Sequence, residues 1–237
     1  MRLFAPLTTL LVVGSALGLA LAFGGSPFAR SEAAVRIDPP AMAAPRGEGL
    51  QTIVLAGGCF WGIQAVYQHI NGVTNAVSCY AGGASNDADY HTVSAGRTRH
   101  AEAVKVTYDP AVVSLGDILQ VFFSVAHNPT ELNRQGPDSG TQYRSEIFPQ
   151  DDAQRDFAKA YVAQLDAAKS FPRPIVTVIG AARANFYPAE AYHQDYAAKH
   201  PRDPYIAIND APKVRNLATS FPTIYRAKPV LVADATR

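Results

Sequence analysis

The residue best placed to do chemistry is a cysteine within the sequence GGCFWG, residues 57–62. Paired glycines allow a tight turn, and a helix start offers unpaired N–H groups and partial positive charge that favour a thiolate. Such a position lowers a cysteine pKa from about 8.5 to roughly 3.5–7.5. Phe60 and Trp61 would form an apolar wall beside the sulfur. We therefore predict that Cys59 is reactive; the alternative is a buried structural cysteine in a tight turn.

A carboxylic acid is the second candidate. In the alternating stretch Ala101–Tyr108, Glu102 is in phase with Val104 and Val106, so its side chain is expected on the apolar face of a strand. A carboxyl group there is costly unless it is protonated or hydrogen-bonded. Because desolvation raises its pKa, Glu102 would be a proton donor near neutral pH. The alternative is that Glu102, at the end of the strand, reaches solvent.

Strands and helices must bring these groups together. Apolar periodicity and turn residues predict strands at 51–55, 74–80, 101–108, 143–148 and 175–179, and helices at 60–69, 114–126, 151–168 and from 189. Ser114 and Asp117 resemble a helix N-cap arrangement. The order β-α-β-β-α-β is the split β-α-β of ferredoxin-like folds. We predict an α+β two-layer sandwich with a mixed sheet, a ferredoxin-like core and a C-terminal extension.

Composition limits the class of protein. The 237 residues carry a net charge of +1 and are 48% hydrophobic and 17% charged, which is typical of a globular protein. The chain lacks the excess of basic residues that nucleic-acid-binding proteins usually carry, so the composition does not indicate a nucleic-acid partner. The two cysteines are too few for a disulfide framework or a four-thiolate metal site.

The N-terminal region differs from the rest of the chain. From Leu3 to Gly24 it carries no charge, and small residues at 20–22 and 31–33 give two candidate cleavage sites. Residues 1–34 are thus predicted to be a signal peptide, or a retained membrane anchor, and residues 35–50 a flexible linker. We expect an exported protein, periplasmic or membrane-anchored and facing the periplasm, whose folded domain spans residues 51–237.

The GCFWG segment resembles the signature of the type A peptide methionine sulfoxide reductases. Further similar segments follow in register at 80–83 (YAGG), 100–102 (HAE), 136–145 (GPDSGTQYRS) and 186–194 (FYPAEAYHQ). The resemblance implies that residues 51–237 form a catalytic domain for thiol-dependent reduction of methionine S-sulfoxide, free or in proteins, and so repair oxidative damage. It implies no metal and no bound cofactor.

The resemblance also implies roles for single residues. Cys59 would attack the sulfoxide sulfur and become a sulfenic acid, and Glu102 would protonate the sulfoxide oxygen. The remaining roles are hydrogen bonds to that oxygen from Tyr80 and Tyr143, methyl binding by Phe60 and Trp61, and positioning of the site by Asp138. Oxidised proteins or peptides would be the substrates of an expected monomer, with a thioredoxin-like protein or a small thiol as reductant.

The chain differs from the family it resembles in the cysteines that would reduce the Cys59 sulfenic acid and regenerate the thiol. Many relatives carry a resolving cysteine near the C-terminus, where this chain has Ile206, while Cys79 and Arg99 stand where glycine is expected. Three alternatives remain for the reduction of the Cys59 sulfenic acid. Cys79 resolves it as an unusual resolving thiol, an external thiol or thioredoxin-like protein reduces Cys59 directly, or Cys79 is an inert buried residue. Strand alternation separates Cys79 from Tyr80, and a disulfide needs Cα atoms within about 7 Å.

Two other classes remain open on the residues alone. A Cys–His hydrolase would use Cys59 with His100 or His193 as base. An exported binding module would hold a structural disulfide between Cys59 and Cys79. His193 and Glu190 lie three residues apart, but two ligands are weak support for a metal, and a helix-surface or supporting role is expected. Arg144 is expected to be a solvated charge.

Overall fold

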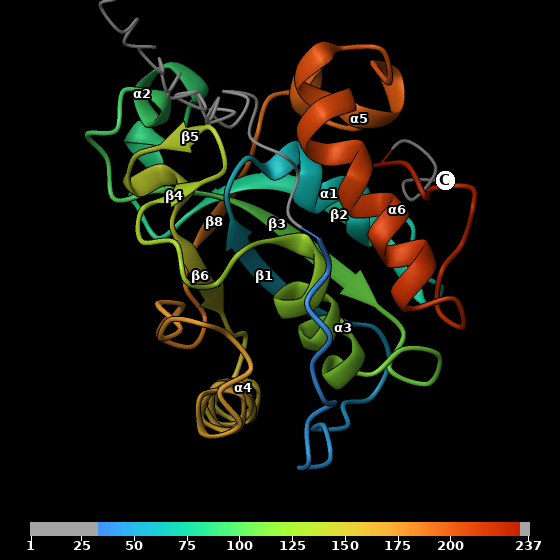
Figure 1. Ribbon diagram of the computed structural model, residues 1–237. Helices are drawn as coiled ribbons and strands as arrows, with labels where there is room; N and C mark the ends of the chain where they lie inside the picture. Colours follow the sequence, from blue (N-terminus) through green and yellow to red (C-terminus); the bar gives the residue numbers. More distant parts are fainter. Residues whose placement is uncertain (1–32, 233–237) are drawn as a thin grey trace, which may run out of the picture.

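A computed structural model describes residues 33–232 (Figure 1). The predicted signal peptide or anchor over residues 1–34 lies, apart from its last two residues, outside the described part of the chain. Within residues 33–232, no helix combines the length and apolar character needed to cross a membrane.

A six-stranded mixed sheet forms the centre of the fold. Its order is β7-β6-β1-β3-β2-β8, and only the β6–β7 pair is parallel. The inner strands β6-β1-β3-β2 have the split β-α-β topology, which confirms the predicted ferredoxin-like core. The strands are β1 Gln51–Gly57, β2 Val73–Ala81, β3 Ala101–Tyr108, β6 Ser145–Phe148, β7 Val178–Ile179 and β8 Phe186–Pro188.

The other elements are helices, short turns and a two-stranded ribbon. The α-helices are α1 Phe60–Gln68, α2 Tyr90–Ser94, α3 Leu115–Val121, α4 Asp152–Ala167, α5 Tyr196–Lys199 and α6 Ala211–Ser220. The 3-10 turns are Ser85–Asp87, Thr141–Tyr143 and Ala191–His193, and π-helical turns span Phe122–Ala126 and Ile206–Asp210. The small ribbon pairs β4 Arg134–Gln135 with β5 Asp138–Ser139.

The two faces of the sheet are buried differently. One face packs against α1, α3, α4 and α6 and forms the main hydrophobic core, which we call the helix-covered face (Figure 1). The opposite face holds a smaller apolar cluster built from strand residues and covered by Ala184 and Phe186; we call it the second face. This confirms an α+β fold with helices and sheet in layers.

Most predicted elements are present, with four differences. The helix predicted from residue 189 is a 3-10 turn, Ala191–His193, followed by the separate short helix α5. The capping box at Ser114 and Asp117 forms, but α3 ends at Val121 and continues as a π-helical turn. Tyr143 lies in a 3-10 turn, and the strand starts at Ser145. The strand predicted at 175–179 is only two residues long, because the Val176 N–H bonds the carbonyl of Pro129 in a loop rather than a strand.

The first part of the predicted flexible linker, residues 35–50, makes hydrogen bonds to the helical part of the fold. Residues 33–41, which we call the N-terminal strap, run beside α3 (Figure 1). Val35 bonds Ser124 in both directions: its N–H donates to the Ser124 carbonyl at 2.9 Å, and its carbonyl accepts from the Ser124 hydroxyl at 2.5 Å. Ile37 is 8% exposed and accepts a bond from Gln120. The polar side chains of two helices thus order a stretch whose Ala and Pro content indicated mobility.

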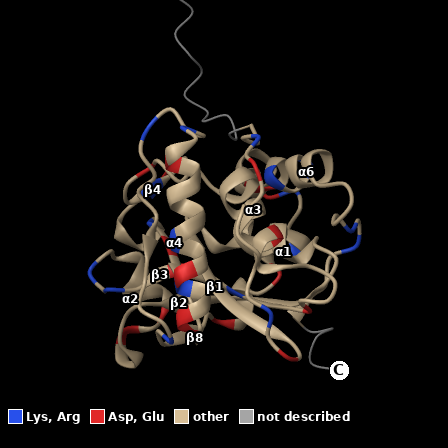
Figure 2. Ribbon diagram, turned by 90° about the horizontal axis from the view of Figure 1, so that it is seen from below, with Lys and Arg blue, Asp and Glu red and all other residues tan. Residues whose placement is uncertain are grey.

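Acidic and basic residues occupy positions spread over the ribbon rather than gathered on one side (Figure 2). The pairs Arg144–Glu146 and Arg155–Asp152 each place opposite charges within 2.6 Å. Interspersed charges of this kind pair locally and make no one-signed field.

Candidate active site

Cys59 lies at the junction between β1 and α1, where it is the N-cap residue of the helix. Gly58 has a φ of +97°, and a Cβ there would be 2.6 Å from the Cβ of Gln135. A Cβ on Gly57 would be 2.9 Å from the His127 ring. Both positions therefore require glycine, for backbone conformation and for close approach respectively. The turn predicted from the sequence is confirmed.

The expected low pKa of Cys59 is not found. Burial raises its pKa well above the ordinary value, and the carboxyl groups of Glu102, Asp210 and Asp138 raise it further. A hydrogen bond from the Trp61 backbone N–H favours the thiolate but does not compensate. The helix start supplies a donor, as expected, but burial outweighs it, and the three acidic neighbours, of which sequence reasoning missed Asp210, add to the effect of burial. Cys59 is a thiol at rest.

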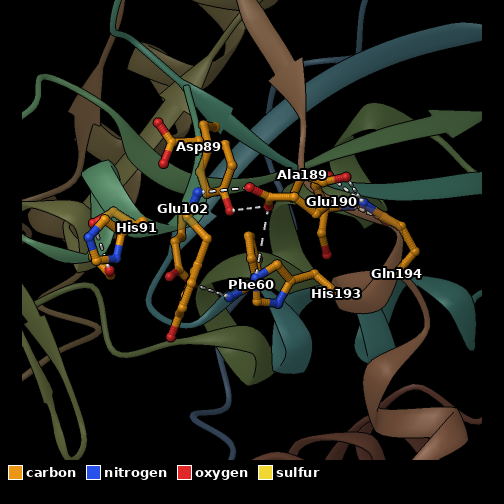
Figure 3. A network of polar contacts seen from close by, with 12 residues as sticks. Phe60, Asp89, His91, Glu102, Ala189, Glu190, His193 and Gln194 are labelled. Carbon is orange, nitrogen blue, oxygen red and sulfur yellow. Dashed lines mark hydrogen bonds and ion pairs between the residues drawn. The ribbon is translucent and has the colours of Figure 1, made fainter. Parts of the chain in front are cut away.

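Glu102 is the acidic neighbour with the largest effect. It lies in β3 on the helix-covered face and is 2% exposed, so the expected apolar environment is confirmed. Its carboxyl accepts the Phe60 N–H at 3.1 Å, directly beside Cys59 (Figure 3). Burial raises its pKa to about 8, with a further contribution from Asp138 and Asp210. Glu102 is thus mostly protonated at neutral pH and is a hydrogen-bond donor as well as an acceptor.

The two aromatic residues after Cys59 have different environments. Phe60 is 1% exposed and belongs to the core, with its ring centroid 5.0 Å from that of His193. Trp61 is partly exposed and stacks on Tyr196, with centroids 3.8 Å apart and ring planes 11° from parallel. Tyr205 meets the same indole edge-on. The exposed apolar wall therefore consists of Trp61 with two tyrosines, and Phe60 forms its buried base.

The two predicted oxygen-binding tyrosines also differ. The Tyr80 hydroxyl donates to the Glu190 carboxylate at 2.8 Å, and the other Glu190 oxygen accepts the Tyr90 N–H at 2.9 Å. Burial and Glu190 raise the pKa of Tyr80. Tyr143 is partly buried, and burial followed by the charge of Glu102 raises the pKa of its phenol. Both phenols stay protonated at neutral pH, but the Tyr80 proton already has an acceptor.

Asp138 and Asp210 complete the acidic surroundings. Asp138, at the start of β5, accepts a very short hydrogen bond from Tyr205, and burial raises its pKa. Asp210 is 1% exposed, lies 3.4 Å from the Lys213 ammonium, and has a pKa raised by burial to about 6. Sequence reasoning missed Tyr205 and Asp210. The i, i+3 spacing of Asp210 and Lys213 was a signal, but it resembles an ordinary surface pair.

The histidines are engaged elsewhere. His193 is 2% exposed, which contradicts a position on a helix surface, and its Nδ1 accepts the Trp61 indole N–H at 3.2 Å. Its Nε2 lies 3.9 Å from Glu190 (Figure 3). His100 uses its ring nitrogens for the Gly83 N–H and the Ala84 carbonyl. Neither is a base for Cys59, so a Cys–His hydrolase is not supported.

Arg144 is not the solvated charge that was expected. Its guanidinium lies 2.6 Å from the Glu146 carboxylate and donates to the carbonyls of Thr141 and Arg99. These bonds tie the turn that carries Tyr143 to the segment before β3. Within residues 33–232, no group of three His, Cys, Asp or Glu side chains is arranged to hold a metal ion.

Cys79 has no part in this constellation. It is fully buried in the apolar cluster of the second face, where burial raises its pKa to about 12. Cys59 packs against the helix-covered core instead, and both cysteines are free thiols. The sheet separates the two thiols, so the strand-alternation argument is confirmed and a structural disulfide between them is contradicted.

The Cys59 thiol at the start of α1 has a protonated carboxyl group, that of Glu102, beside it, and phenols belong to the same site. These groups suit the reduction of a polar sulfur–oxygen bond. Comparison with known proteins decides the family: the family model for peptide methionine sulfoxide reductase matches residues 51–223. The chain belongs to the peptide methionine sulfoxide reductase family. It is therefore an oxidoreductase.

Individual relatives agree with the family assignment. The reductase is 58% identical over 188 residues to peptide methionine sulfoxide reductase MsrA 2 of Mesorhizobium japonicum, covering 79% of this chain and 96% of the relative. It is 42% identical over 210 residues to the protein of the same name from Synechocystis sp., covering 86% and 96%.

Solved structures share the fold of the reductase. Reduced Mxr1 from Saccharomyces cerevisiae superposes with a TM-score of 0.57 and 36% identity, covering 65% of this chain and 87% of that chain. Methionine sulfoxide reductase A of Corynebacterium diphtheriae gives a TM-score of 0.55 and 32% identity, covering 66% and 78%.

Proposed function

We propose that the reductase converts methionine S-sulfoxide, free or in oxidised proteins, to methionine through a sulfenic acid on Cys59, and so repairs oxidative damage. One observation carries this proposal: the Glu102 carboxyl, with a pKa near 8, bonds the Phe60 N–H next to Cys59. A proton donor that is almost fully buried and a sulfur nucleophile are thereby held side by side.

Proton delivery makes the reaction feasible. A sulfoxide oxygen leaves sulfur only when it is protonated, so Glu102 donates a proton to it while the Cys59 sulfur attacks the sulfoxide sulfur. The oxygen ends on Cys59 as a sulfenic acid, methionine leaves, and the thiol proton restores Glu102. The methionine sulfur gains the two electrons that the Cys59 sulfur loses.

Phenol donors stabilise the charge that develops on oxygen. The Tyr143 hydroxyl has no hydrogen-bond partner among the described residues and is free to donate to the substrate. Tyr80 donates to Glu190 at 2.8 Å, so it serves the substrate only after exchanging that partner. Asp138 holds Tyr205 at the edge of the site.

The substrate methyl group would pack on Trp61. The indole is held by stacking on Tyr196 and by its hydrogen bond to His193. Burial of apolar area contributes about 25 cal/mol per Å², so a rigid indole favours the S-methyl end of the substrate over a more polar group.

Electrons for the next turnover come from outside the chain in this proposal. Cys79 lies on the second face with a pKa of about 12, so it is neither placed nor ionised to attack the sulfenic acid. A thioredoxin-like protein or a small thiol would serve as the reductant. The reductase would act as a monomer on protein or peptide substrates, without metal, bound cofactor or nucleic acid.

One turnover without reductant tests the mechanism. Mass spectrometry of the full chain, after one equivalent of methionine S-sulfoxide, should show a gain of about 16 Da that dimedone traps on Cys59. A loss of about 2 Da with a Cys59–Cys79 crosslink contradicts external reduction. An unmodified Cys59 beside a full equivalent of methionine contradicts the sulfenic acid.

We also propose that the reductase is exported, to the periplasm or to a membrane facing it. The uncharged run from Leu3 to Gly24 after Arg2 supports this. Fractionation of cells, with N-terminal sequencing of the recovered protein, should place it outside the cytoplasm, either shortened near residues 22–34 or bound to the membrane. An intact chain in the cytoplasmic fraction contradicts export.

A further inference from the structure

Cys59 borders a cavity that the proposed substrate residues do not line. The cavity measures about 290 Å³, and Cys59, Asp138 and Tyr205 contribute to its wall. Glu102, Tyr80, Tyr143, Phe60 and Trp61, all of them described residues, are not part of that wall. Cys59 and Asp138 thus line a cavity whose wall contains neither the acid nor the phenols.

The second reaction at the Cys59 sulfur needs a second direction of approach. A thiol attacks a sulfenic acid in line with the departing oxygen, as in thiol–disulfide exchange, where the attacked sulfur lies between nucleophile and leaving group. The oxygen comes from the sulfoxide and ends near Glu102, whose carboxyl is bonded beside Cys59. The attacking thiol must therefore come from the side away from Glu102, and the cavity opens to Cys59 without passing Glu102.

The remaining walls indicate the kind of thiol. Arg173 and Lys213 line the cavity beside Asp138, and Lys213 is paired with Asp210, so Arg173 is the wall cation without an ion-pair partner among the described residues. Arg173 is exposed, while Lys213 is partly buried beside Asp210. Ala33 and Val35 of the N-terminal strap close another side. A cavity of about 290 Å³ with the Arg173 guanidinium in its wall suits a small anionic molecule.

We propose that this cavity is the entry site for the reductant, and that it takes a small thiol bearing a carboxylate. The proposal rests on the proposed function. It adds the side from which the Cys59 sulfenic acid is reduced and the chemical class of the thiol that reduces it. The observation that carries it is that Cys59 and Asp138 line a cavity from which Glu102 is absent, although Glu102 is hydrogen-bonded to the residue next to Cys59.

The atoms and electrons balance with two equivalents of thiol. The first thiol gives its proton to Asp138, and its sulfur bonds Cys59 as the hydroxyl departs. That hydroxyl takes the Glu102 proton and leaves as water, and the Asp138 proton returns to Glu102 through solvent. A second thiol attacks the mixed disulfide on its outer sulfur. Cys59 regains its thiol, and the two small thiols leave as a disulfide, oxidised by two electrons in total.

Narrowing the cavity is the first test. Ala33 is exposed and lies on the strap, so Ala33→Trp should fill part of the cavity and leave the core intact. The matched control is Met42→Trp, an exposed position that does not line this cavity. In the full chain, 3-mercaptopropionate should reduce Cys59 sulfenic acid about tenfold more slowly in Ala33→Trp than in Met42→Trp. The burst of methionine should proceed at the same rate in both.

Changing the charge is the second test. Arg173→Gln should slow reduction by 3-mercaptopropionate about threefold to tenfold, with rates corrected for thiol ionisation. The same variant should change the rate with neutral 2-mercaptoethanol less than twofold and should not slow cationic cysteamine. The matched control is Arg155→Gln, which removes an arginine from α4, away from the cavity.

The outcomes separate this inference from the proposed function. Cys59 sulfenic acid is also made with one equivalent of hydrogen peroxide, so the reductant site is tested even if methionine sulfoxide gives no burst. Equal rates for Ala33→Trp and Met42→Trp with all three thiols overturn the proposal. It is also overturned if Ala33→Trp raises only the KM for a methionine sulfoxide peptide, because the cavity then binds substrate, or if only a thioredoxin reduces Cys59 at a measurable rate.

Discussion

The two cysteines of this reductase lie on opposite faces of one sheet and have opposite fates. Both thiols have a raised pKa, and burial is the first cause in each case. Cys79 is surrounded by small strand residues, whereas Cys59 has Glu102, Asp138 and a cavity beside it. Thiol pKa therefore does not distinguish the working cysteine from the silent one. The two cysteines are distinguished by the acidic neighbours that can donate or accept a proton and by the access that reactants have to the sulfur.

This difference changes how Cys59 is understood to be activated. A thiolate at rest would be stabilised by the helix start alone, but three carboxyl groups oppose it. Their effect falls when Glu102 is protonated, and its pKa of about 8 makes this the resting state at neutral pH. The site thus keeps its proton until a substrate arrives that consumes it, and a low background reactivity is expected between turnovers.

The largest difference in activity is expected between the two single variants in which one cysteine is replaced by serine. Cys59→Ser should abolish reduction of methionine S-sulfoxide, since a serine hydroxyl cannot take up the oxygen. Cys79→Ser should keep a full first turnover of one methionine per chain. Both are measured by chromatography of methionine after rapid mixing without reductant. A stoichiometric burst in Cys59→Ser contradicts the assignment of the nucleophile.

Removal of the acid should have the next largest effect. Glu102→Gln keeps an acceptor for the Phe60 N–H but loses the transferable proton, so the first-turnover rate should fall about 10²–10⁴-fold. In the wild type, that rate should fall as pH rises through about 8, the pKa of Glu102, because the donor is lost. The decline should be absent from the residual activity of Glu102→Gln. An identical pH profile in both proteins excludes Glu102 as the donor.

The same substitution has a signature in stability. The pKa of Glu102 is 4.5 unperturbed and about 8 in the folded chain, so the folded state binds the extra proton between these values. Wild-type stability from this group is therefore lost as pH rises from 4.5 to about 8. The unfolding free energy of Glu102→Gln relative to wild type should grow over that window and stay constant below it. Urea titrations at pH 4.5, 6 and 8 measure it.

Labelling should separate the two thiols by accessibility. With iodoacetamide at pH 8, Cys59 should react at least about 100-fold faster than Cys79, because Cys79 is fully buried within the sheet and needs unfolding to react. Mass spectrometry of the digested protein gives both rates. In urea above the unfolding midpoint, the two rates should become equal, which is the internal control.

A smaller effect is expected at the edge of the site. Tyr205→Phe removes the hydrogen bond that lowers the pKa of Asp138, so this pKa should rise further in the variant. We expect kcat/KM to fall about threefold to tenfold, with the acidic limb of the profile moved to higher pH. The matched control is Tyr225→Phe, whose ring stacks on His69 away from Cys59 and should leave kcat/KM unchanged.

The smallest effect on activity is expected on the second face. Cys79→Ser places a hydroxyl in an apolar cluster, which should lower the free energy of unfolding by about 1–3 kcal/mol. Cys79→Ala should cost less, because it leaves no unpaired polar group. Turnover with an added thiol should equal that of the wild type for both. A loss of thiol-dependent turnover in both Cys79 variants would indicate a redox role for Cys79.

The sequence predicted those features that depend on local periodicity. Alternation in Ala101–Tyr108 placed Glu102 on the apolar face, and alternation around Tyr80 placed Cys79 on the other one. The glycine pair located the turn before Cys59. Each of these depends on neighbours within a few residues, so the pattern is sufficient.

What the sequence did not show depends on distant packing. The raised pKa of Cys59 comes first from burial and then from acidic neighbours, among them Asp210 and Asp138, which lie just before α6 and in a small ribbon. The order of the strap depends on Ser124 and Gln120, whose bonds are made with its backbone and leave no side-chain pattern in it. Long-range electrostatics and side-chain-to-backbone bonding are invisible to periodicity.

The strand order has a consequence for how the chain must mature. Cys59 follows β1 and Glu102 lies in β3, and the two meet through the ladder that pairs Leu55 with Val104. Until that ladder closes, the chain carries two ordinary thiols with no acid between them and no sheet to separate them. Folding is therefore also a protective step: it gives one thiol its chemistry and puts the other beyond the reach of oxidants. A chain that meets an oxidant before β1 joins β3 is open to a Cys59–Cys79 crosslink that locks the sheet apart.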